Sequence, residues 1–175
     1  MKLQFLIPFF GSKMLFRRES KQKGFTLVEL IITMVIIAIL SVIAVPQIYN
    51  HYVSNKILAA ANIILADIRF AQSLAITEHD STWVVFDDAQ HKYGLYYGPT
   101  MNDSPVLNTS GDPFIQQLDQ GHFKNVIISS LDIGNDKSIS FDWSGNTSDS
   151  GTIILNNSVT VHVELNTGMV KIIGW

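Results

Sequence analysis

The chain has 175 residues, which is enough for one modest domain beside a membrane-spanning segment. It has no cysteine, and this excludes a disulfide framework, a thiolate metal site and a cysteine nucleophile. The formal net charge is −3, with six Lys and Arg against thirteen Asp and Glu after His51; we therefore expect no nucleic-acid partner, because phosphate binding needs a clustered basic surface.

The opening segment is basic, with six Lys and Arg before Phe25 and Glu19 as its only acid. Met14 offers an alternative start, so we expect residues 1–13 to be a dispensable extension. Positive residues that flank a membrane span stay in the cytoplasm. The charge pattern therefore places the N-terminus inside and the acidic domain outside.

An apolar run follows this basic segment and predicts a transmembrane helix. Residues 30–45 are apolar apart from Thr33 and Ser41, and with residues 25–29 they make about 20 residues, the length that crosses a bilayer. Glu29 lies inside this run, where an ionised carboxylate costs roughly 2.5 to 3.5 kcal/mol. Glu29 therefore needs a partner.

The boundary between Gly24 and Phe25 is a candidate processing site. A peptidase that cuts after Gly24 would leave a new α-amine on Phe25, four residues before Glu29. Residues four apart lie on one helix face, so this amine could neutralise Glu29 of its own chain or of a neighbouring chain. The second arrangement would favour assembly in the membrane.

The motif Gly-Phe-Thr-Leu-Val-Glu of residues 24–29, followed by an apolar helix, resembles the class III signal of type IV pilins and of type II secretion pseudopilins. The resemblance implies that a prepilin peptidase cuts after Gly24 and methylates Phe25, and that Glu29 guides subunit docking. Many major type IV pilins close a C-terminal loop with a disulfide. The lack of cysteine therefore favours a pseudopilin or a minor pilin.

Pro46 follows the apolar run, where it is expected to kink the helix because it removes one backbone hydrogen bond; the alternative is that it ends the span. Residues 47–78 again predict a helix, rich in alanine and without glycine or proline. We expect Lys56 and Arg69 to lie in water. The row expected to pack on a sheet comprises Leu58, Ala61, Leu65, Ile68, Ala71 and Ala75.

The chain after His79 predicts strands. Segments 81–86 and 92–97 are predicted to form a hairpin, because Asp87-Asp88 and the residues after them supply a turn. Residues 98–121 predict a long loop with one short element at 114–118, for which we expect a role in subunit contact. The further strands expected are residues 126–130, 138–143, 152–155, 159–165 and 169–173.

The last two strands are joined by Asn166-Thr167-Gly168, which suits a tight hairpin. Val159, Val161, Val163 and Leu165 alternate with polar residues, which predicts one buried and one solvated face. We expect this apolar row to rest on the helix.

This second half resembles the GspH/FimT family of minor pseudopilins and pilins, through LADIRFAQSLAITE followed by TWVVFD, the strand KYGLYY, and the strand pair around residues 166–168. DNA-receptor members of the FimT branch carry a basic C-terminal tail. Here the chain ends MVKIIGW, with Lys171 as its only charge, which counts against DNA uptake.

Catalytic and metal motifs are not found in the sequence, and we expect no enzyme activity, cofactor or metal. The five histidines lack metal-ligand spacing, and His162 is expected to be solvated. The loop 142–149 carries oxygen donors without EF-hand spacing, which leaves calcium as a minor alternative. Trp143 and Trp175 are interpreted as core or interface aromatics.

The predicted fold is therefore α+β and pilin-like, with a long N-terminal helix packed on an antiparallel sheet domain. We divide the chain into a removed leader (1–24), a transmembrane half of the helix (25–45), an amphipathic half (46–79) and a β-rich domain (80–175). The function expected is a structural minor subunit of a type II secretion pseudopilus or a type IV pilus, anchored in the inner membrane with its domain in the periplasm. Its partners would be the prepilin peptidase and other pilins or pseudopilins.

The alternative function is an exported binding or enzymatic domain on an ordinary signal peptide or signal anchor. Val42-Ile43-Ala44 loosely suits a signal peptidase, which would leave a mature chain starting near Val45. Against this alternative, the apolar run is long for a signal peptide and contains Glu29, and Pro46 lies just beyond the cut.

Overall fold

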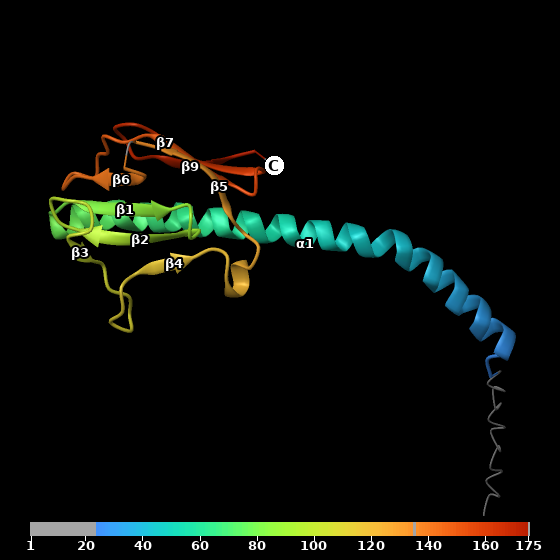
Figure 1. Ribbon diagram of the computed structural model, residues 1–175. Helices are drawn as coiled ribbons and strands as arrows, with labels where there is room; N and C mark the ends of the chain where they lie inside the picture. The colour runs from blue at the N-terminus through green and yellow to red at the C-terminus, as the bar shows by residue number, and fades with distance from the viewer. Residues whose placement is uncertain (1–23, 135, 175) are drawn as a thin grey trace, which may run out of the picture. The chain divides into compact units, whose positions relative to one another are not determined.

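The computed structural model describes residues 24–134 and 136–174, without the side chains of Pro46, Tyr49 and Asn50. Residues 1–23 and the expected role of Trp175 therefore lie outside the described part. Helix α1 runs through Pro46, and the expected kink there stays a prediction. The chain divides into two compact units, residues 1–43 and 44–175. One helix, α1 (Leu27–Glu78, 52 residues), contributes to both units. The predicted helix of some fifty residues is thus confirmed (Figure 1).

The second unit contains two antiparallel sheets. In the first sheet the order is β3-β2-β1-β6, and β4 also pairs with β2; in the second the order is β5-β7-β8-β9. The strands are β1 (Thr82–Asp87), β2 (Lys92–Tyr97), β3 (Ser104–Pro105), β4 (Ile115–Gln117), β5 (Ile128–Ile133), β6 (Ser138–Phe141), β7 (Gly151–Leu155), β8 (Val159–Val163) and β9 (Val170–Ile173).

Both predicted hairpins form. Strands β1 and β2 pair from Thr82↔Tyr97 to Asp87↔Lys92, and β8 pairs with β9. Asn166 and Gly168 have φ values of 67° and 62°, the left-handed conformation that the tight turn requires. A Cβ on Gly168 would lie 2.6 Å from the ring of Phe141, so the second hairpin also depends on close packing at this glycine.

The segment expected to be a long loop folds back on strand β2. Strand β3 pairs with one part of β2 and β4 with another, and the short 3-10 helix η1 (Gly121–Phe123) follows. Figure 1 shows β4 and η1 on the side of α1 away from β5, β7 and β9. The expected role of this segment in subunit contact stays a prediction.

One hydrophobic core joins α1 to both sheets. On the sheet side, Val159, Val161 and Val163 are buried as predicted, but Leu165 is 50% exposed and lies beyond the end of β8. On the helix side, the predicted row is confirmed at Ala61, Ile68, Ala71 and Ala75, which are buried, and at Leu65, which is half-buried and packs against the core. Leu58 is only half-buried, and its buried neighbour Ile57 takes its place in the row. The buried helix residues are Ile57, Ala60, Ala61, Ile64, Ile68, Ala71 and Ala75.

Polar side chains of α1 also donate hydrogen bonds to other parts of the domain. Arg69 is exposed, as expected, whereas Lys56 is half-buried. The Lys56 ammonium donates to the carbonyl of Lys124 (3.2 Å), and the Arg69 guanidinium donates to the carbonyl of Val170 (3.3 Å). Gln72 donates to two carbonyls in the loops after β6 and β8. The long stems of Lys and Arg cover apolar surface while their charged ends find acceptors.

A buried tyrosine on β2 links this sheet to a carboxylate on α1. The hydroxyl of Tyr93 donates to Asp67 Oδ2 at 2.5 Å, and Tyr93 is 1% exposed. Burial raises the pKa of Asp67, and the hydrogen bond from Tyr93 opposes this shift in part. Burial of the Tyr93 hydroxyl, and to a lesser extent the nearby Asp67 carboxylate, raises the pKa of Tyr93, which keeps the hydroxyl protonated as a donor.

Asp67→Asn is therefore expected to remove a pH-dependent loss of stability. Because the pKa of Asp67 is higher in the folded chain than in the unfolded chain, the folded state holds more protons just above pH 3.8, and the wild type loses stability as pH rises through that range. Asparagine keeps an acceptor for Tyr93 but has no charge. Urea unfolding at several pH values should show the wild type weakening relative to the variant as pH rises. A constant difference, or one of opposite slope, would contradict this assignment.

Candidate processing and assembly site

The residues of the candidate site lie at the start of α1, within the first unit. Gly24, Phe25 and Thr26 precede the helix, which begins at Leu27. The Thr26 side-chain oxygen accepts a hydrogen bond from the Glu29 amide (3.2 Å), and the Thr26 carbonyl accepts one from the Leu30 amide (3.1 Å). Thr26 is therefore the residue that caps the helix.

The cap was missed in the sequence reasoning, although the sequence carries its signal. Thr26 and Glu29 have the spacing of a capping box, in which a threonine is followed three residues later by a glutamate. Glu29 also lies in the first turn, where the helix dipole favours a negative charge. These effects hold Glu29 at the start of the helix before it meets any partner.

Phe25 lies outside the helix in the uncleaved chain, which changes the expected geometry. The pairing of Phe25 with Glu29 was argued from residues four apart on one helix face, but the helix starts two residues later. The structure nevertheless brings the residues together, because Gly24, Phe25, Thr26 and Glu29 line one surface depression. Pairing between a new amine on Phe25 and Glu29 stays a prediction.

The bond between Gly24 and Phe25 is accessible in the described part of the chain. Phe25 is 79% exposed, and a Cβ placed on Gly24 would meet no atom within 4 Å. Exposed segments outside regular secondary structure are preferred sites of proteolytic cleavage. The local geometry at Gly24 and Phe25 is thus compatible with cleavage there.

The first part of α1 has the surface of a membrane span. The segment Leu27–Val45 is long and apolar enough to cross a membrane, and none of it is buried. The hydroxyls of Thr33 and Ser41 donate to helix carbonyls at 2.8 and 2.7 Å, so neither is left unpaired. The segment His51–Glu78 also passes this length and composition test, but 33% of it is buried and it forms part of the domain core.

The remaining candidates from the sequence are the loop 142–149, considered for calcium, and Trp143. In the loop after β6, the Asp142 carboxylate accepts hydrogen bonds from Ser144 and Asn146, and those bonds hold its pKa below the usual range. Among residues 24–134 and 136–174, no three His, Cys, Asp or Glu side chains are grouped to hold a metal. Trp143 is 64% exposed, so it is not a core residue; a role at an interface stays a prediction.

Two family models match the chain in sequence. The model described as "Prokaryotic N-terminal methylation motif" matches residues 20–45, and the model described as "Type II transport protein GspH" matches residues 60–168, more than half of the chain. The chain belongs to the GspH family. The first match covers Gly24, Phe25 and Glu29, so this GspH-family protein carries the motif at the place where the structure forms the candidate site.

The curated relatives are fimbrial proteins. The chain is 40% identical over 86 residues to a type IV major fimbrial protein FimA of Dichelobacter nodosus, an alignment that covers 44% of this chain and 52% of that protein. A second FimA of the same organism is 46% identical over 106 residues, which cover 59% of this chain and 62% of that protein. This GspH-family chain thus spans about half to three fifths of the length of these relatives.

A solved structure supports the fold. The minor pseudopilin EpsH from the type 2 secretion system of Vibrio cholerae aligns with 68% of this chain and 96% of its own, with a TM-score of 0.50 and 10% sequence identity. At this low identity the likeness concerns the fold alone. The predicted α+β architecture, a long helix followed by antiparallel sheets, is confirmed.

Proposed function

We propose that the protein is a non-enzymatic structural subunit of a type II secretion pseudopilus or a type IV pilus, as a minor component. The observation that carries this proposal is the methylation motif at residues 20–45, followed in the same chain by the GspH match at 60–168. A fully exposed apolar helix begins within that motif. The fimbrial relatives support a type IV pilus, and the likeness in fold to a pseudopilin is compatible with a type II secretion pseudopilus.

The first proposed step is processing by a prepilin peptidase. The enzyme cuts between Gly24 and Phe25, removes the leader and methylates the new amine of Phe25. The exposed ring of Phe25 and the open space around Gly24 support this assignment. The helix start at Leu27 supports it as well, because the bond to be cut lies outside the helical hydrogen bonds.

The second proposed step is assembly through Glu29. Before assembly the subunit waits in the inner membrane as a single-pass protein, with its N-terminus in the cytoplasm and its domain in the periplasm. The Glu29 carboxylate then meets the Phe25 amine of a neighbouring subunit, since a charge in lipid is costly without a partner. Pro46 is proposed to bend the helix between its membrane half and its domain half. We expect no nucleic acid among the partners.

Analysis of the mature N-terminus tests this proposal. The protein should be purified from its native membrane or fibre, and its first peptide should be identified by mass spectrometry. We expect a chain that begins at Phe25 and carries one added methyl group. A chain that begins near Val45 would instead support an exported domain on a signal peptide, and a chain that keeps Lys23 and Gly24 would contradict processing.

A further inference from the structure

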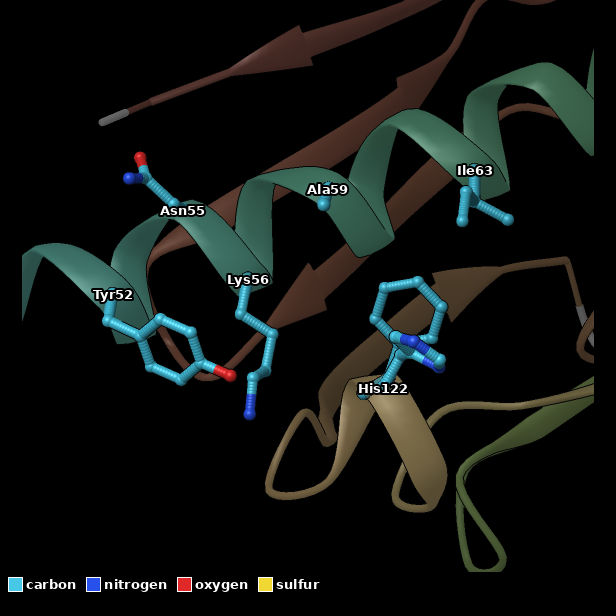
Figure 2. A pocket seen from close by; sticks show the side chains of 7 residues that line it. Tyr52, Asn55, Lys56, Ala59, Ile63 and His122 are labelled. Carbon is cyan, nitrogen blue, oxygen red and sulfur yellow. The ribbon is translucent and has the colours of Figure 1, made fainter.

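A groove lies between helix α1 and the short helix η1. The largely apolar side chains that line it are those of Tyr52, Ala59, Ile63 and Phe123. The groove holds a space of about 570 Å³, and Figure 2 shows Tyr52 and Ile63 pointing from α1 toward the side on which η1 lies. Tyr52 is 61% exposed and Ala59 is also exposed, so the groove is open to solvent. An accessible apolar groove is a candidate site for an apolar ligand.

Two lysines that are not paired with an acid meet beside this groove. Residues 52–175 contain six Lys and Arg. In the described part of the chain, three of them have an Asp or Glu within 4.0 Å, namely Lys92, Lys137 and Lys171. Arg69 is bonded to a carbonyl of β9, far from the groove in sequence. The other two are Lys56 and Lys124, and the Lys56 ammonium donates to the Lys124 carbonyl at 3.2 Å.

The Lys56 ammonium is held at the groove with donors to spare. It lies 4.9 Å from the centre of the Tyr52 ring, and its bond to a carbonyl uses one of its three N–H donors. Lys124 is exposed and lines the adjoining depression together with Tyr52 and Lys56. The nearby carboxylate of Asp119 accepts the amide of Asn125 (3.0 Å). An anionic group at this end of the groove can therefore meet two ammonium groups.

The groove follows the apolar segment closely along the chain. Tyr52 comes seven residues after Val45, the last residue of the segment Leu27–Val45, on the same continuous helix. Seven helical residues extend over about 10 Å, so Tyr52 is no farther than this from the end of the segment, whatever the direction of the helix. The headgroup layer of a bilayer adds roughly 5 to 8 Å to each side of its hydrocarbon core. In a membrane that Leu27–Val45 spans, the groove therefore begins beside the headgroups, where tyrosine and lysine are favoured.

We propose that this groove binds an anionic phospholipid of the membrane while the subunit is outside the fibre. The inference rests on the proposed function, which places Leu27–Val45 in that membrane. The lipid phosphate accepts hydrogen bonds from the ammonium groups of Lys56 and Lys124. One acyl chain lies between Tyr52 and Phe123, where it covers apolar surface that is otherwise in contact with water.

The charge of the domain favours an anionic lipid over other ligands. Residues 52–175 carry thirteen Asp and Glu against six Lys and Arg, so most of the domain repels an anionic membrane surface. The pair Lys56 and Lys124 thus selects the part of the domain that approaches the lipid. A phosphate without a chain would leave the groove exposed, and a chain without an anion would leave both lysines unmatched.

Native mass spectrometry of the chain purified from its own membrane tests the site, with phosphatidylglycerol and phosphatidylcholine as probes. We expect phosphatidylglycerol to bind more tightly, and the double variant Lys56→Gln with Lys124→Gln to lose roughly thirtyfold in its affinity, the effect of two lysine charges at an anionic lipid surface. The matched control, Lys137→Gln with Lys171→Gln, removes the same charge from lysines that are paired with acids and should keep the wild-type affinity. Equal binding of the two lipids, or equal losses in the two double variants, would overturn the inference.

A charge within the groove tests the place of the acyl chain. Ala59→Glu should lower the affinity for phosphatidylglycerol by about tenfold or more, because a carboxylate covered by a lipid chain is costly. Ala89→Glu adds the same charge to the exposed turn between β1 and β2 and should have no effect. Because both alanines are exposed, each variant should keep the wild-type resistance of its domain to proteolysis. Glycerol 3-phosphate that competes as well as the intact lipid would show a phosphate site without a chain and would overturn the inference.

Photocrosslinking identifies the occupant in the cell. With p-benzoyl-phenylalanine in place of Ala59, the membrane-resident subunit should become attached to phospholipid, whereas the same probe in place of Ala89 should not. Attachment at position 59 to a protein alone would overturn the inference. A chain that begins at Phe25 and binds no lipid would overturn this inference and leave the proposed function intact, whereas a chain that keeps its leader would overturn the proposed function.

Discussion

Glu29→Ala is expected to leave cleavage after Gly24 intact and to abolish incorporation of the subunit into fibres. The carboxylate is the only acidic group in the apolar segment, and its removal would leave the neighbour's Phe25 amine without a partner in lipid. Breaking a buried ion pair by removing one member typically costs about 3 to 5 kcal/mol, so the loss of incorporation should be on the order of a hundredfold or more. The measurement compares mature protein in membranes with protein in sheared fibres.

Glu29→Gln is the control that separates charge from the local structure of the helix start. Glutamine keeps the size and polarity of the residue at the third helical position, where Glu29 donates its amide to Thr26. If the charge is what matters, the glutamine variant should be cleaved normally and fail in assembly like the alanine variant. Incorporation of Glu29→Ala at the wild-type level would refute the docking role of Glu29.

The local elements of the domain could be predicted from the sequence because their signals are short-range. Strand β2 has the predicted bounds, since KYGLYY is a run of strand-forming residues after a turn. The turn begins at Asp88, because Asp87 is the last residue of β1. The alternation of Val159, Val161 and Val163 likewise gave the buried face of β8. Each of these signals is contained within a few neighbouring residues.

The pairing between distant segments could not be predicted in the same way. Strand β6 lies beside β1, and β4 pairs with β2, although long stretches of chain separate each pair. Periodicity describes which side of a strand is buried but not which strand lies next to it. The division into two sheets, and the pairing of the expected loop 98–121 with β2, are therefore seen only in the structure.

The helix row could be predicted except at one position. Ala61, Ile68, Ala71 and Ala75 are buried and Leu65 packs against the core, whereas Leu58 is only half-buried. Leu58 directly follows the buried Ile57, and in a helix rich in apolar residues steps of three and four can be drawn through either of the two. Periodicity alone therefore leaves the position of the buried side open by one residue.

At the candidate site, the sequence identified Gly24, Phe25 and Glu29 but not the cap at Thr26. The first three were found through their chemistry. Gly24 is the residue before the expected cut, Phe25 would carry the new amine, and Glu29 is an acid within an apolar run. The cap depends on a helix start at Leu27, and element ends are the least certain feature of a sequence pattern. The helix start also moved Phe25 out of the helix and changed the geometry of its expected pairing with Glu29.

Gly151→Ala is expected to destabilise the second sheet strongly. Gly151 begins β7 and pairs with Ile133 of β5. A Cβ at this position would overlap the carbonyl oxygen of Asp132 and lie 2.8 Å from the Cα of Ile133. These are main-chain atoms that cannot rotate away, so β5 would have to shift, at a cost of about 3 kcal/mol or more. Urea unfolding of the full chain in detergent, followed by near-ultraviolet circular dichroism, measures the loss.

Gly94→Ala is the matched control, because it adds the same methyl group to a strand of the other sheet. There the nearest atom is Tyr96 Cε2 at 3.1 Å, part of a side chain that can turn aside, and the nearest main-chain atom is the Phe114 carbonyl at 3.4 Å. We expect this variant to change stability by less than about 1 kcal/mol. Equal losses at Gly94 and Gly151 would contradict the close approach of β5 to β7. A loss confined to Gly151 would instead show that this sheet, which holds Val161 and Val163 against α1, depends on a position that admits only glycine.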